Sequence, residues 1–105
     1  GKDGALLVTP HFTYGQNAYP VHAIDATGAG DTFWGTFLSA FTETGLSLDA
    51  FAADRNAVAR AAAYGAAAAA LCTTKKGGLP SIPTRAEVEK AAKALLQAPN
   101  TPSIL

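Results

Sequence analysis

The chain has 105 residues, the length of one domain, and 49% of them are hydrophobic, which excludes a disordered or purely solvated segment. Eight basic and eight acidic residues give a formal net charge of +0, so the composition does not support binding to nucleic acid or to an anionic membrane surface. The most apolar run, AAAYGAAAAALC, is too short and too rich in alanine to predict a membrane span.

The first part of the chain is typical of β-structure. The apolar run GALLVT, Gly4 to Thr9, predicts a strand of a mostly buried sheet that ends before Pro10. The next segment, HFTYGQNAYPVHAI, places aromatic and branched residues around a glycine and a proline. It predicts a second strand, a turn, and a third strand near Val21 to Asp25.

From Asp31 the apolar spacing changes to that of a helix. Phe33, Phe37 and Phe41 are four residues apart, and Trp34 with Leu38 widens the same apolar face. We expect this helix to end at Gly45 as its C-terminal cap.

The second half of the chain predicts further helices. Ser47 or Asp49 can cap a helix that runs through AFAADRNAVARAAAYGAAAAALC, with one break near residues 54–56. TTKKGGLPSIP predicts a loop, and Thr84 and Glu87 stand in capping-box register before a final helix. Strands followed by helices indicate an incomplete α/β unit.

The segment DATGAGDTFWG, Asp25 to Gly35, combines three glycines and two carboxylates at the start of a helix. A helix N-terminus has unpaired N–H groups and a partial positive charge, so it attracts phosphate. Gly28, Ala29 and Gly30 have almost no side chains to obstruct an anion. Asp31 would then lie where a base could take the proton of an attacking hydroxyl.

A simpler interpretation is that Asp31 caps the helix and the glycines form a turn, and general principles alone favour it. Other phosphate motifs are excluded. The P-loop pattern needs a Gly-Lys-Ser/Thr ending, which is absent, and the dinucleotide pattern needs a third glycine where this sequence has Phe33.

DATGAGDTFWGTFL resembles the C-terminal signature of the ribokinase-like, or PfkB, carbohydrate kinases. GKDGALLV resembles the segment that lines the nucleotide site in that family, and AAAAALCTTKKGGLPSIPTRAEVE is similar to its closing helix, glycine loop and final helix. The resemblance runs from about Gly1 to Leu96 in the family's order, which reverses the preference for the simpler interpretation.

The resemblance implies roles for individual residues. Asp31 matches the catalytic base, and Gly28, Ala29 and Gly30 match the anion hole that holds the transferred phosphoryl. The nucleotide-binding positions implied are Gly1, Gly4 and Gly65. A monovalent cation such as K⁺ would be held by Asp25, Thr27, Cys72, Lys75, Gly77 and Ser81.

The resemblance also implies an architecture and ligands. It predicts a ribokinase-like, Rossmann-type three-layer α/β/α fold, of which residues 1–105 are the C-terminal nucleotide-binding and catalytic portion. The sugar-binding N-terminal part and its lid are then missing, so we expect little activity from this chain alone. The missing part or a second chain would be its partner, with a homodimer as a further option. ATP, Mg²⁺ and a small sugar are the implied ligands.

Several hypotheses remain for the identity of the sugar and for the function. GDTFWG and KKGGLPSIPT look most like fructokinase-type members, whereas ribose, 2-keto-3-deoxygluconate and nucleoside kinases share the GAGD core. A nucleotide- or anion-binding module without catalysis, or a remnant with a decayed site, is the alternative function. One cysteine, no zinc-spaced cluster and no visible secretory leader predict a reducing, cytoplasmic compartment.

Overall fold

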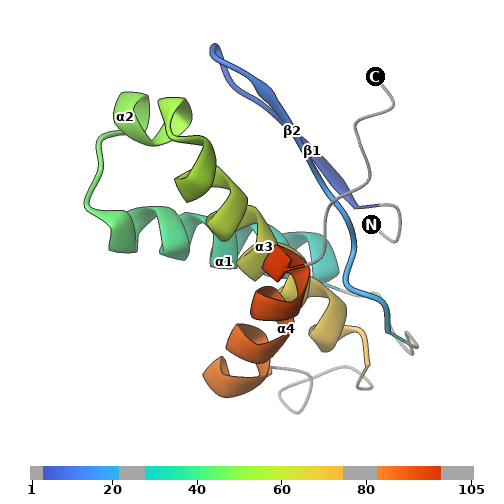
Figure 1. Cartoon of the computed structure of the whole chain (residues 1–105). Coiled ribbons are helices and arrows are strands. Elements are labelled where there is room, and N and C mark those ends of the chain that lie inside the picture. The colour runs from blue at the N-terminus through green and yellow to red at the C-terminus, as the bar shows by residue number, and fades with distance from the viewer. Residues whose placement is uncertain (1–3, 22–27, 75–82, 98–105) are drawn as a thin grey trace.

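The computed structural model describes residues 4–21, 28–74 and 83–97. The elements in these ranges are β1 (Ala5–Val8), β2 (Thr13–Gln16), α1 (Ala29–Thr44), α2 (Leu48–Ala53), α3 (Arg55–Cys72) and α4 (Arg85–Gln97). Helix α3 is the central element, because it contacts α1, α2, α4 and β2 (Figure 1). The two strands form one antiparallel sheet.

The β1–β2 hairpin confirms the first two predicted strands. Leu7 pairs with Tyr14, and the turn is closed by the Thr9 N–H, which donates to the carbonyl of Phe12 at 2.9 Å. The guanidinium carbon of Arg55, at the start of α3, lies 5.2 Å from the ring centroid of Phe12 and 5.6 Å from that of Tyr14. Cation–π attraction therefore helps to hold the hairpin against α3. The predicted third strand near Val21 to Asp25 lies almost entirely outside the described residues, and Val21 itself is not in a strand.

Helix α1 begins at Ala29, two residues earlier than predicted, and ends as predicted at Gly45. Gly45 has a left-handed φ of 70° and its N–H donates to the carbonyl of Thr42. The predicted apolar face is correct for its phenylalanines, since Phe33 and Phe37 are buried. It is wrong for Trp34 and Leu38, which are more than half exposed because α3 covers a narrower stripe of α1 than the sequence pattern suggested.

The predicted break in the long alanine-rich helix is confirmed. The Ser47 hydroxyl accepts a hydrogen bond from the Ala50 N–H and caps α2. Asp54 then separates α2 from α3, and its carboxylate accepts from the Ala57 N–H at 3.1 Å. Each of these short polar side chains therefore pairs one of the first amides of its helix where the chain turns.

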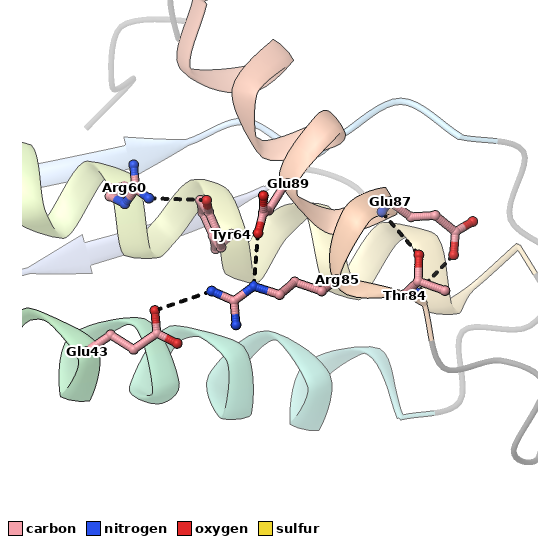
Figure 2. A network of polar contacts seen from close by, with 7 residues as sticks. All are labelled: Glu43, Arg60, Tyr64, Thr84, Arg85, Glu87 and Glu89. Carbon is pink, nitrogen blue, oxygen red and sulfur yellow. Dashed lines mark hydrogen bonds and ion pairs between the residues drawn. The ribbon is translucent and has the colours of Figure 1, made fainter.

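Helix α4 starts with the predicted capping box. The Glu87 N–H donates to the Thr84 hydroxyl, and the Thr84 N–H donates to the Glu87 carboxylate (Figure 2). Arg85 adds a link between helices, because it donates to Glu89 at 2.9 Å and lies 3.8 Å from Glu43 of α1. The hydrogen bond to Glu89, and after it the charge of Glu43, raises the pKa of Arg85. These groups are exposed, so the pairs contribute little to stability.

The core depends on a close approach between α1 and α3. Most buried residues of α3 are alanines, which allow neighbouring helices to pack closely. Gly65 lies at a close contact between these helices: a Cβ placed there would lie 2.9 Å from the carbonyl oxygen of Phe33 and 3.0 Å from its ring. Phe33 and Phe37 stack with ring centroids 6.1 Å apart, and Phe37 meets Phe51 of α2 edge-on at 5.7 Å.

We expect Gly65→Ala to lower the free energy of unfolding by about 1–3 kcal/mol, because the added methyl group overpacks the contact with Phe33. Gly35→Ala is the matched control, since Gly35 lies inside α1 and a Cβ there meets nothing within 4 Å. It should raise stability by roughly 0.5–1 kcal/mol through helix propensity. Urea denaturation of the two variants measures both effects. Equal free energies of unfolding for the two variants would contradict this account of the contact.

Candidate active site

The N-terminus of α1 is built around Gly28. This residue is the N-cap with φ 80° and ψ 1°, a left-handed conformation that glycine adopts without strain. The Thr32 N–H and the Thr32 hydroxyl both donate to the Gly28 carbonyl, each at 2.9 Å. Helical hydrogen bonding therefore begins at Thr32, and the N–H groups of Ala29, Gly30 and Asp31 have no partner within the helix.

The space in front of this helix end is open within the described structure. Gly28 and Gly30 are exposed, and a Cβ added at either would meet nothing within 4 Å. Gly28 has no side chain with which to cap α1, whereas Ser47, Asp54 and Thr84 cap the helices that follow them. Amides at the positive end of a helix dipole, left uncovered, fit a phosphate group.

Asp31 is not the N-cap, so the simpler interpretation of this acid is wrong. The N-cap position belongs to Gly28, and Asp31 is the acidic residue of the first turn of α1. Its side chain is exposed. A carboxylate in the first turn interacts favourably with the positive end of the helix dipole. Asp31 therefore suits this helix end without being its N-cap.

Phe33 fixes the position of this helix end. It follows Asp31 by two residues, is buried, and makes the contact with Gly65 described above. The predicted nucleotide-binding residue Gly65 is thus a buried packing residue in the structure, and its contact with a nucleotide stays a prediction.

The structure describes only some of the other predicted site residues. Gly4 precedes β1 with φ 91°, and a Cβ there would collide with the Gln16 carbonyl, so glycine is required for a structural reason. Cys72 lies in the last turn of α3, where its thiol donates to the Ala69 carbonyl at 3.1 Å. Outside the described residues lie Gly1, Asp25, Thr27, Lys75, Gly77 and Ser81.

Residues 4–21, 28–74 and 83–97 contain no group of three or more His, Cys, Asp or Glu side chains that could hold a metal ion. None of the helices in these ranges is both long and apolar enough to cross a bilayer.

Sequence reasoning missed the contribution of Thr32. Its hydroxyl joins its own amide on the Gly28 carbonyl, which secures the left-handed residue from inside the helix. A threonine hydroxyl in a helix often donates to the carbonyl four residues earlier. The spacing of four residues between Gly28 and Thr32 was therefore the available signal.

On an α/β scaffold, a glycine-opened helix N-terminus beside a carboxylate is an arrangement that suits a bound phosphate group. Residues 1–85 match the model of the family described as "pfkB family carbohydrate kinase". The chain therefore belongs to the pfkB family, which confirms the resemblance.

Individual relatives agree with this family. The chain is 38% identical over 94 residues to a protein named "Probable fructokinase-5" of Arabidopsis thaliana, and these residues are 90% of this chain and 28% of that protein. It is 34% identical over 90 residues to "Fructokinase-1" of Oryza sativa, covering 86% of this chain and 27% of the relative. The chain thus spans little more than a quarter of these relatives.

Solved structures confirm the ribokinase-like α/β fold. A ribokinase from Thermotoga maritima matches with a TM-score of 0.69 at 36% identity, over 88% of this chain and 27% of that one. A fructokinase from Vibrio cholerae, solved with fructose, ADP and calcium ion, matches with a TM-score of 0.72 at 29% identity, over 88% of this chain and 28% of that one. An Arabidopsis thaliana ribokinase complexed with ribose and ATP matches with a TM-score of 0.69 at 33% identity, over 88% of this chain and 27% of that one.

The left-handed N-cap yields a prediction about stability. We expect Gly28→Ala to destabilise the chain by about 1–2 kcal/mol, because a side chain at positive φ is strained. Gly30→Ala should be neutral or slightly stabilising, since Gly30 lies inside α1 without a positive φ. Thermal unfolding followed by circular dichroism compares the two. A Gly28 variant as stable as the Gly30 variant would show that the left-handed turn is not maintained in solution.

Proposed function

We propose that this chain provides the phosphoryl-transfer site of an ATP-dependent carbohydrate kinase of fructokinase type. The observation that carries the proposal is the N-terminus of α1, where the amides after Gly28 have no intrahelical partner and lie beside the exposed Asp31. Family membership supplies the reaction class, and the helix end supplies groups that suit it.

The backbone of Gly28, Ala29 and Gly30 acts as the anion hole in this proposal. Charge on the transferred phosphoryl is spread over its oxygens, so fixed N–H donors stabilise it in the transition state. The absence of contacts around a Cβ at Gly28 or Gly30 supports this role, because a phosphate needs that space.

Asp31 acts as the general base. The sugar hydroxyl oxygen attacks the γ-phosphorus of ATP, the bond from that phosphorus to the ADP oxygen breaks, and the hydroxyl proton passes to the Asp31 carboxylate. The exposure of this carboxylate in the first helical turn supports the role, because a base must reach the hydroxyl of its substrate.

Mg²⁺ supplies positive charge that offsets the phosphate charge when it is bound with the nucleotide. Nucleotide-bound Mg²⁺ is held mainly by phosphate oxygens and water, with one or two protein carboxylates, so no cluster of three ligands is required of the described residues. The E. coli putative ribokinase II solved with ATP and Mg²⁺, which matches with a TM-score of 0.67 at 26% identity, supports this pairing.

A monovalent cation, K⁺ in the simplest case, would lie near Asp25 and Thr27 and be completed by the loop residues Lys75, Gly77 and Ser81. Of this set the structure describes Cys72 alone. The Cys72 carbonyl belongs to the last turn of α3, where helical carbonyls lack an intrahelical donor and suit a cation.

Fructose is the favoured substrate because the relatives at 31–38% identity carry fructokinase names. Ribose, 2-keto-3-deoxygluconate and nucleosides are the alternatives. We further propose that residues 1–105 are the C-terminal catalytic portion of one kinase domain that works in the cytoplasm. The sugar site and lid would then come from the rest of the domain, in the same chain or another.

The test uses a chimera in which this chain replaces the matching segment of the Vibrio cholerae fructokinase. We expect Asp31→Asn to lower kcat by roughly 100- to 10,000-fold, since a general base contributes that much, while the KM for ATP changes little. Coupled-enzyme detection of ADP measures both constants.

Glu43→Gln is the matched control, because it removes the same charge from an exposed acid at the other end of α1 and should retain full turnover. An Asp31→Asn variant that keeps more than a tenth of the parent kcat would remove Asp31 from the mechanism. ATP binding by the chimera without any sugar-dependent ADP release would instead favour the non-catalytic binding module.

A further inference from the structure

Helix α3 carries a glycine at a position where neither backbone conformation nor helix propensity calls for one. Gly65 lies inside α3, between the alanines at 61–63 and 66–70, and its φ is not positive. Glycine weakens a helix interior relative to alanine, so the surroundings have to explain the missing methyl group. Gly65 is buried, and the three atoms nearest to a Cβ placed there all belong to Phe33 of α1.

The contact at Gly65 involves the backbone of α1 as well as a side chain. A Cβ at residue 65 would lie 2.9 Å from the Phe33 carbonyl oxygen, about 0.5 Å short of ordinary van der Waals contact. A ring can shift by itself, but a carbonyl inside a helix is held by the helical hydrogen bonds and moves only with its helix. The methyl group would therefore push α1 away from α3 rather than displace one side chain.

The other half of α1 is held by separate contacts. Phe37 and Phe41 both meet the ring of Phe51 in α2, at centroid distances of 5.7 and 4.7 Å. A displacement at Phe33 therefore tilts α1, because the far half of the helix stays in place. The movement is largest at the N-terminal end, beyond Phe33.

The proposed reacting groups lie at the end of α1 that such a tilt moves. Asp31 precedes Phe33 by two residues, about 3 Å along the helix axis, and the N-cap Gly28 precedes Phe33 by about 7.5 Å. Both the carboxylate and the first amides of α1 consequently move with Phe33. Phosphoryl transfer depends on alignment, and a misplacement of about 1 Å can cost about 100-fold in rate.

We propose that Gly65 is a positioning residue of the phosphoryl-transfer site, because it sets how closely α1 approaches α3 and thereby where Asp31 and the amides of residues 29–31 lie. This role rests on the proposed function, in which this helix end carries out the chemistry. It differs from the nucleotide contact that the resemblance implies for Gly65. A residue that touches ATP affects the KM for ATP, whereas a residue that positions the reacting groups affects kcat.

Two variants perturb the contact from opposite sides in the chimera with the Vibrio cholerae fructokinase. Gly65→Ala adds a methyl group against Phe33, and Phe33→Leu removes ring atoms that lie against Gly65. We expect each variant to lower kcat on the order of 10-fold with little change in the KM for ATP, because the displaced groups act in the transition state. Coupled-enzyme detection of ADP measures both constants, and circular dichroism establishes that the variants are folded.

Val58→Ala is the matched control, since it truncates a buried side chain of the same helix away from the proposed site. Val58 is 1% exposed and lines a groove with Phe37 and Phe51, about 10 Å along α3 from Gly65. This variant should lose stability as Phe33→Leu does, and should retain the parent kcat. An equal loss of kcat in Val58→Ala would make the effect one of stability and overturn the role of Gly65.

The result for Asp31→Asn separates this role from the proposed function. Loss of turnover in Asp31→Asn, together with a parent-like kcat in both Gly65→Ala and Phe33→Leu, overturns the positioning role alone. Full turnover in Asp31→Asn overturns the proposed function and the positioning role together. A raised KM for ATP with a retained kcat in Gly65→Ala would assign Gly65 to nucleotide binding instead.

Discussion

The contact between Phe33 and Gly65 is the constraint on which the other features of the chain depend. A helix as rich in alanine as α3 has little side-chain surface with which to specify a partner, and it relies on close approach. Gly65 permits that approach at one point, and the ring of Phe33 occupies the space a side chain would otherwise fill. The stacked Phe37 and the edge-on Phe51 then extend the contact to α2.

This packing also explains how an uncapped helix end can be maintained. Unsatisfied amides and a left-handed N-cap weaken the start of a helix, so a buried anchor close to that end is needed to hold it in place. Phe33 provides the anchor within the first turns of α1, and Thr32 secures the Gly28 carbonyl. Tertiary packing therefore supplies the stability that the first turn of α1 lacks, because its first amides have no intrahelical partner.

Local features of the fold could be predicted from the sequence because each depends on neighbouring residues. The glycine that ends α1, the serine that caps α2 and the capping box of α4 all follow from short-range hydrogen bonding. One prediction failed where distant packing decides. Trp34 and Leu38 fit the apolar period of α1 but are exposed. The N-cap at Gly28 agrees with setting aside Asp31 as the cap. The proposed roles at the site came from resemblance, because a helix N-terminus alone does not specify a reaction.

The exposed face of α1 carries Asp31 together with two apolar side chains. Asp31, Trp34 and Leu38 are spaced three and four residues apart, so they follow one another along one side of the helix. Phe33 and Phe37 occupy the neighbouring side, against α3. Asp31 therefore lies on a face of α1 that the described residues leave exposed. Since phosphoryl transfer requires the exclusion of water, the proposed role of Asp31 requires that the rest of the kinase domain cover this face.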